Sequence, residues 1–90
     1  MVITSIIPCI KVTKENNMSG IDMYIELGDR IKIIDNEDNT FIGILSFIEL
    51  GKDEEDDDII YLLLDNEKVI NIGISYIKDI DILKNIRTHK

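Results

Sequence analysis

The sequence has little of what most enzymes use for catalysis. It contains one cysteine, Cys9, and one histidine, His89, which is the penultimate residue. Histidine-activated nucleophiles and zinc sites need such residues in close groups, and the chain has no glycine-rich phosphate loop. A single cysteine also excludes an internal disulfide. We therefore expect no enzymatic activity, no catalytic residue, no metal site and no cofactor, with Cys9 as a small packing residue.

Alanine and tryptophan are absent, proline occurs once, at Pro8, and isoleucine dominates the apolar residues. β-branched residues lose rotamer freedom in helices and fit pleated surfaces, so this composition favours strands. The apolar run over residues 2–10 is interrupted by Pro8 and is too short to span a bilayer. It also lacks the basic start of a signal peptide. We expect a cytoplasmic protein without a membrane segment.

Basic residues are scarce relative to acidic ones. The 90 residues include 10 Lys and Arg against 18 Asp and Glu, a formal net charge of −8. Most nucleic-acid affinity comes from counterion release by clustered Lys and Arg. This balance argues against nucleic acid and anionic lipid as partners, and it suits solubility or pairing with a basic protein.

Five strand-like runs separated by polar turns lie between residues 28 and 83. They cover residues 30–34, 41–50, 59–64, 69–74 and 80–83. Residues 75–79 are too few for an α-helix and predict one 3₁₀ turn. We therefore predict an all-β fold, a small and strongly bent five-stranded barrel.

Alternation gives the first of these strands its faces. Ile31 and Ile33 should point inward, while Arg30 and Lys32 point to water. Residues 35–39 are rich in Asp and Asn, which bond to their own backbone and tolerate left-handed conformations, so they predict a hairpin loop.

The chain before residue 28 is less regular. Residues 1–13 alternate loosely and predict an extended strand with Pro8 at an edge or a bulge. Residues 21–27 suit either a short helical turn or a strand, and we favour the strand. The chain reads as one domain, with residues 1–27 as an extension on or beside the barrel and residues 84–90 as a polar tail.

The second strand of the barrel is apolar on both faces. One face carries Ile42, Ile44, Ile48 and Leu50, and the other carries Phe41, Gly43, Leu45 and Phe47. A half-buried strand would have a polar face, so both sides of this strand should be covered. Gly43 indicates a bend or a close approach of another backbone. Bending explains part of the pattern, and a subunit contact would explain the rest.

An acidic run follows this strand. Its members are Asp53, Glu54, Glu55, Asp56, Asp57 and Asp58. Carboxylates attract divalent cations, but this run has no glycine turn to fold them inward, so we interpret it as a solvated loop whose like charges repel. If it binds anything, we expect a basic protein partner.

Several motifs resemble the Sm-like family of small barrels of the Src-homology-3 type. The run from Phe41 to Leu45 is similar to that family's aromatic-x-Gly-x-Leu motif. The segment from Ile70 to Gly73, followed by Tyr76, is similar to its fourth strand and the turn beyond. The resemblance covers residues 28–83. It implies rings of subunits, in which the fourth and fifth strands of neighbouring copies pair.

Two departures from the family pattern concern RNA binding. Family members that bind RNA carry an Asp and an Asn in the loop after the glycine-bearing strand, where this chain has the acidic run. They also carry an Arg before the later glycine, where this chain has Ile72. No RNA-binding residue can be transferred to this sequence.

Three functional hypotheses remain. The first is a non-enzymatic protein-interaction or assembly module that self-associates, because the chain has more apolar strand surface than one small barrel hides. The second is an Sm-like RNA-binding protein. The third is an acidic decoy, in which the run from Asp53 to Asp58 occupies a basic DNA-binding protein.

Overall fold

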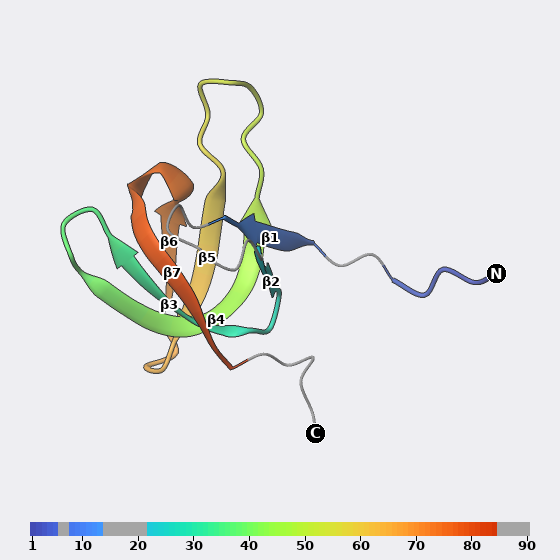
Figure 1. Cartoon of the computed structure of the whole chain (residues 1–90), viewed down its shortest axis with the longest axis horizontal. Helices are drawn as coiled ribbons and strands as arrows, with labels where there is room; N and C mark the ends of the chain where they lie inside the picture. Colours follow the sequence, from blue (N-terminus) through green and yellow to red (C-terminus); the bar gives the residue numbers. More distant parts are fainter. Residues whose placement is uncertain (6–7, 14–21, 85–90) are drawn as a thin grey trace.

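The computed structural model describes residues 1–5, 8–13 and 22–84, and in this part the fold is all-β. The described residues form seven strands, one 3₁₀ turn and no α-helix, arranged as in Figure 1. The elements are β1 (Cys9–Val12), β2 (Met23–Glu26), β3 (Arg30–Asp35), β4 (Thr40–Glu49), β5 (Ile59–Leu64), β6 (Val69–Gly73), the 3₁₀ turn η1 (Ile74–Tyr76) and β7 (Ile77–Lys84). The prediction of an all-β chain is confirmed. No described segment is a helix with the length and apolar character needed to cross a membrane.

Five of the strands form one antiparallel sheet in the order β6-β5-β4-β3-β7, and β1 and β2 form a separate two-stranded sheet. The five-stranded sheet is strongly curved but is not closed into a barrel, which corrects the predicted closure. The reason lies in the pairing of the last two strands. β6 pairs with β5 and β7 pairs with β3, and in the described residues no ladder joins β6 to β7 across the short η1 turn.

The ten-residue strand β4 bends at a β-bulge. Its register with β5 shifts between Leu45 and Phe47, and the Ser46 hydroxyl donates a hydrogen bond of 3.1 Å to the Tyr61 carbonyl. Gly43 serves a different purpose. A Cβ at this position would lie 2.3 Å from the carbonyl oxygen of Leu63, so Gly43 allows the close approach of β5.

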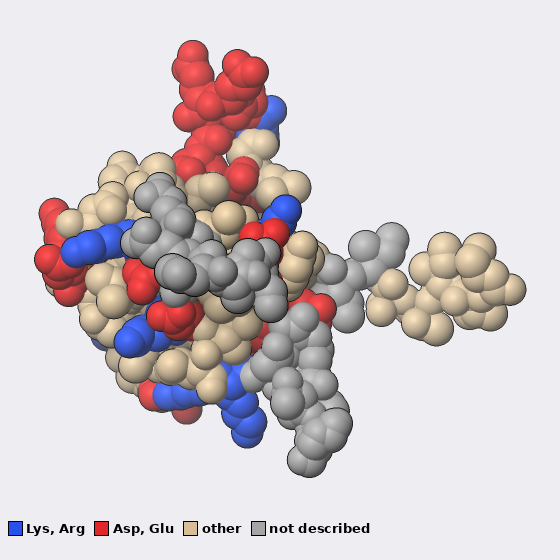
Figure 2. Space-filling model, viewed as in Figure 1, with Lys and Arg blue, Asp and Glu red and all other residues tan. Residues whose placement is uncertain are grey.

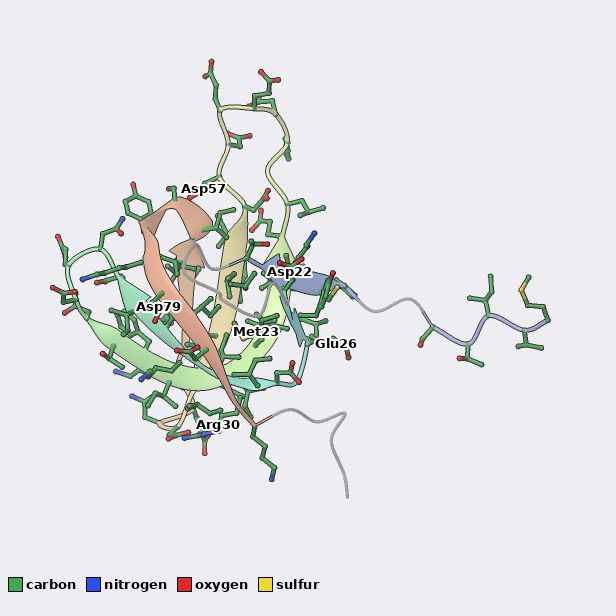
Figure 3. The ribbon with its side chains drawn as sticks, viewed as in Figure 1. Asp22, Met23, Glu26, Arg30, Asp57 and Asp79 are labelled. Carbon is green, nitrogen blue, oxygen red and sulfur yellow. The ribbon has the colours of Figure 1, made fainter. Side chains whose placement is uncertain are left out.

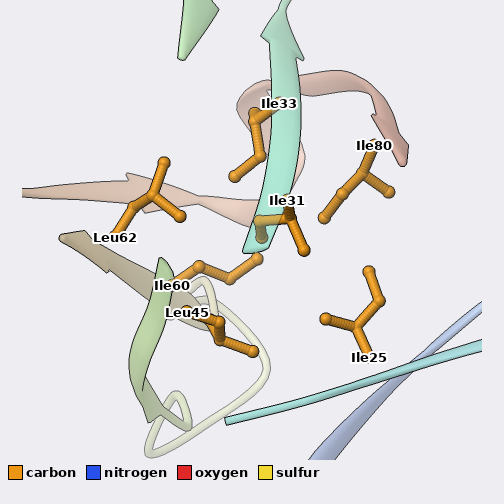
Figure 4. Packing of buried hydrophobic residues seen from close by; sticks show 7 residues of the cluster. All are labelled: Ile25, Ile31, Ile33, Leu45, Ile60, Leu62 and Ile80. Carbon is orange, nitrogen blue, oxygen red and sulfur yellow. The ribbon is translucent and has the colours of Figure 1, made fainter. Parts of the chain in front are cut away.

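One side of the sheet carries the core (Figure 4). Its buried apolar side chains are Ile25, Ile31, Ile33, Leu45, Ile60, Leu62 and Ile80. The inward orientation predicted for Ile31 and Ile33 is confirmed, because both are fully buried. Ile25 belongs to β2, so the two-stranded sheet packs against the curved sheet through the core.

The turn between β2 and β3 is tied to β4 through the buried Asp29. Its carboxylate accepts a 2.8 Å hydrogen bond from the Glu26 N–H, and its carbonyl accepts a 3.0 Å bond from the Leu45 N–H. Gly28 has a φ of 96°, a left-handed conformation that favours glycine. Gly28 and Asp29 therefore form a turn whose hydrogen bonds connect the end of β2 to β4.

Several boundaries differ from the sequence-based expectation. The N-terminal strand was expected over residues 1–13, but β1 begins at Cys9, directly after Pro8, and residues 1–5 form no strand. Residues 6 and 7 and the loop predicted at residues 14–20 lie outside the described residues. The strand favoured over residues 21–27 is confirmed by β2 (Met23–Glu26). The 3₁₀ turn is shorter than predicted, and β7 already begins at Ile77. Within the predicted polar tail, Lys84 belongs to β7, and the rest lies outside the described residues.

Candidate interaction surface

A row of exposed apolar side chains crosses the outer face of the sheet, opposite the core. Ile44 pairs with Leu63, and Leu63 pairs with Val69, so the three side chains lie next to one another on β4, β5 and β6. Their exposed fractions are 38%, 36% and 56%. We call these three residues the outer apolar row. Apolar side chains that are contiguous and exposed are typical of interaction surfaces.

A second row on the same face contains two aromatic rings. Phe47 pairs with Tyr61, and Tyr61 pairs with Asn71. The two rings pack edge to face with centroids 5.5 Å apart, and Phe47 remains 55% exposed. The Tyr61 hydroxyl donates a 2.7 Å hydrogen bond to the Glu49 carboxylate, which raises the pKa of Tyr61.

The bulge at Ser46 explains why Phe47 joins this face. Strict alternation places Phe47 with Gly43 and Leu45, the inner side, and the structure shows that this assignment is wrong. The extra residue in β4 reverses the alternation, so that Phe47 turns outward and Ile48 packs against the core. Of the apolar side chains on β4 and β5, Ile44 is exposed whereas Leu62 is fully buried, so the sheet hides only part of its apolar surface.

The acidic loop between β4 and β5 protrudes from the sheet, and Figure 2 shows its carboxylates gathered at the end of the molecule. Two of its members are engaged at its base. The Asp58 carboxylate accepts a 2.7 Å hydrogen bond from the Gly51 N–H. The Asp57 carboxylate accepts bonds from the N–H and the hydroxyl of Ser75, and Figure 3 shows Asp57 beside the η1 turn.

The remaining members of the loop differ from these two. Asp53 accepts a 2.9 Å hydrogen bond from the N–H of Glu55 and so shapes the turn at the tip. The side chains of Glu54, Glu55 and Asp56 are exposed. Among the described residues, no group of three or more His, Cys, Asp or Glu is arranged to hold a metal ion. The structure therefore divides the run into a tethered base and an exposed tip.

A groove of about 700 Å³ lies between β1, η1 and β7. It is lined by Ile10, Lys11, Val12, Thr13, Ile60, Ile74, Ile77, Lys78, Asp79 and Ile80. Both lysines in its wall are ion-paired, Lys11 with Asp22 and Lys78 with Asp38. The Thr13 hydroxyl, with Lys11, lowers the pKa of Asp22, and Asp38 raises the pKa of Lys78. The groove is therefore mainly apolar, and its positive charges are already matched by carboxylates.

The apolar residues that the sequence placed on one face of β4 lie in different environments. Ile44 is exposed on the outer face, Ile42 is only partly exposed, and Ile48 packs against the core. Cys9 is exposed on β1, which differs from the expected packing role, and His89 lies outside the described residues. Leu63 and Val69 were missed as members of one row, because register between strands cannot be obtained from alternation within each strand.

Comparison with protein-family models, with curated proteins and with solved structures gives no match. The surfaces described above are therefore interpreted from their own geometry and chemistry.

Proposed function

We propose that this protein is a non-enzymatic interaction and assembly module that self-associates. The observation that supports the proposal is the outer apolar row, Ile44, Leu63 and Val69, which ends on the edge strand β6. In the described residues, seven apolar side chains form the buried core, whereas twelve large apolar side chains are exposed. A surface of this kind is costly to leave in water and favours a protein partner.

The proposed assembly can be tested by size-exclusion chromatography with light scattering over a wide range of protein concentration. We expect a mass above that of the 10.3 kDa chain at high concentration. Leu63→Ser should lower the association, because it interrupts the outer apolar row. Leu83→Ser is the matched control, since Leu83 is 48% exposed but lies on β7, away from the row. A wild-type chain that stays monomeric at the highest concentration contradicts the proposal.

The Sm-like relationship is the finer part of this proposal. It is supported by the long glycine-bearing strand β4 and by the single 3₁₀ turn between β6 and β7. RNA binding, which the resemblance also suggests, has less support, because Ile72 and the acidic run occupy the positions of the RNA-binding residues. A gel-shift experiment with single-stranded RNA at low salt tests it, and we expect no shift.

The acidic loop supports a second candidate function, the occupation of a basic protein partner. Its tip contains the exposed residues Glu54, Glu55 and Asp56, and the loop projects beyond the sheet (Figure 1). The informative variant replaces only these three residues with Ser or Gly, because Asp57 and Asp58 anchor the base. A pull-down from the native host that loses a basic protein on this replacement supports the decoy function, and an unchanged pull-down contradicts it.

A further inference from the structure

The hydrogen-bonding pattern between β5 and β6 shows which backbone N–H and C=O groups of β6 remain available to pair with another strand. At one end the Leu64 N–H donates a 2.8 Å hydrogen bond to the Lys68 carbonyl, and at the other the Ile74 N–H donates a 2.9 Å bond to the Asp58 carbonyl. Antiparallel ladders alternate between hydrogen-bonded and non-hydrogen-bonded pairs. Ile70 and Ile72 therefore bond to β5.

The other three residues of β6 alternate with these. Val69, Asn71 and Gly73 direct their N–H and C=O groups away from β5, toward the free edge of the sheet. Val69 is 56% exposed and Asn71 is also exposed, and among the described residues no strand pairs with this edge. Unpaired groups in a row of this kind are a template for the addition of a strand.

The two edges of the sheet differ in how well they resist such pairing. β6 reads Val-Ile-Asn-Ile-Gly, with no charged residue and no proline, and its register with β5 has no shift. β7 carries Lys78, Asp79, Asp81 and Lys84, and its register with β3 is interrupted twice. Charges and bulges are the usual protection of edge strands. Only β6 lacks them, which favours pairing of β6 with β6 over pairing of β6 with β7.

We propose that two copies of this chain pair antiparallel through β6, about a twofold axis at Asn71. The inference rests on the proposed self-association and places the contact at the free edge of β6, where the outer apolar row ends. Val69 then lies opposite Gly73 of the second copy, next to the Asp57 carboxylate that occupies the space beside Gly73. The three outward-facing residues of each copy form about six intermolecular backbone hydrogen bonds. The interface is isologous, so it closes at two copies.

Charge supports the antiparallel direction. The acidic loop joins β5 near Ile59, which pairs with Gly73, so the loop lies at the Gly73 end of β6. A twofold axis at Asn71 places the two acidic loops at opposite ends of the interface, each beside the Lys68 end of the other β6. A parallel pairing places both loops together, where their charges repel. Because each copy carries a net charge of −8, added salt should strengthen the dimer.

The test compares two substitutions at one residue. Asn71→Pro removes the outward N–H without removing a bond to β5, and proline is tolerated on edge strands. Asn71→Ala removes the same side chain but keeps the N–H. Sedimentation equilibrium should show a dimer for the wild type and for Asn71→Ala, and a loss of at least tenfold in association for Asn71→Pro. Circular dichroism establishes that each variant is folded.

Amide hydrogen exchange of the wild type gives a second readout that needs no substitution. With rising protein concentration, the N–H groups of Val69, Asn71 and Gly73 should become protected, while those of Ile70 and Ile72 are protected throughout. An associating chain in which Asn71→Pro has no effect and protection appears on β7 instead overturns the β6 interface and leaves the proposed self-association intact. A wild-type chain that never associates overturns both.

Discussion

Asp57 and Ser75 join the base of the acidic loop to the turn between β6 and β7. One carboxylate oxygen of Asp57 accepts hydrogen bonds from the Ser75 N–H at 3.0 Å and from the Ser75 hydroxyl at 2.7 Å. A Cβ at Gly73 would lie 2.3 Å from the same oxygen, so the glycine leaves room for the carboxylate. Asp57 therefore links the acidic loop to the η1 turn, although the composition of the acidic run predicts only a solvated loop.

Replacing Asp57 by alanine should destabilise the fold. Hydrogen bonds to a charged acceptor contribute about 1.5–3 kcal/mol, and this pair is partly exposed, so we expect a loss of about 1–2 kcal/mol. Urea denaturation measures it. Asp56→Ala is the control, because Asp56 is exposed at the tip and should change stability by less than about 0.5 kcal/mol. Equal effects of the two substitutions contradict the role assigned to Asp57.

Gly43→Ala should be more damaging than Gly73→Ala. The added methyl group at residue 43 meets the Leu63 carbonyl, which is backbone in the middle of the β4–β5 ladder, whereas at residue 73 it meets the end of the Asp57 side chain. Overpacking typically costs about 1–3 kcal/mol, and we expect Gly43→Ala at the upper end of that range. In an Asp57→Ala background, Gly73→Ala should cost less than in the wild type, while the cost of Gly43→Ala should not change. Thermal unfolding of the five variants tests both statements.

Much of the fold follows from local patterns in the sequence. Ile31 and Ile33 alternate with Arg30 and Lys32, and this period of two is enough to place both isoleucines in the core. Gly28 and Asp29 mark the turn before them. The length of β7 was harder to predict, because Lys78 and Asp79 are typical of turns although they lie in a strand at the edge of the sheet.

The candidate surface was less predictable than the core. Its two rows depend on the register between β4, β5 and β6, and on the bulge that turns Phe47 outward. A bulge inserts one residue and reverses every later assignment on that strand. Ser46, the polar residue within an apolar run, was the one local signal for it. Closure of the barrel also depends on distant strands, which local alternation does not specify.

Glu67→Gly should stabilise the protein. Glu67 lies in the turn between β5 and β6 with a φ of 68°, a left-handed conformation that costs non-glycine residues about 1–2 kcal/mol. The gain is reduced by the greater flexibility of glycine in the unfolded chain, so we expect about 0.5–1 kcal/mol in urea denaturation. Glu67→Ala removes the same carboxylate but keeps the strained conformation, so it should give no comparable gain. A larger gain for alanine than for glycine contradicts this explanation.

Asp35 should make stability fall in acid. Its carboxylate accepts hydrogen bonds of 2.9 Å from the N–H groups of Glu37 and Asn39 and one of 3.1 Å from the Asn39 side chain. The backbone bond from Asn39 is the main cause that lowers the pKa of Asp35 below its usual value near 3.8. Because the folded state holds the charged form more strongly than the unfolded state, the contribution is complete above the unfolded pKa. It is lost as the pH falls through the lower, folded pKa.

Asp35→Asn keeps the size of the side chain and removes its titration. We expect the urea midpoint of this variant to lie below that of the wild type at pH 7, and the difference to shrink as the pH falls below about 4. Glu54→Gln is the matched control, since Glu54 is exposed at the tip of the acidic loop and its removal changes the net charge equally. If the two variants show the same dependence on pH, general charge repulsion accounts for the acid sensitivity and the hydrogen bonds of Asp35 do not.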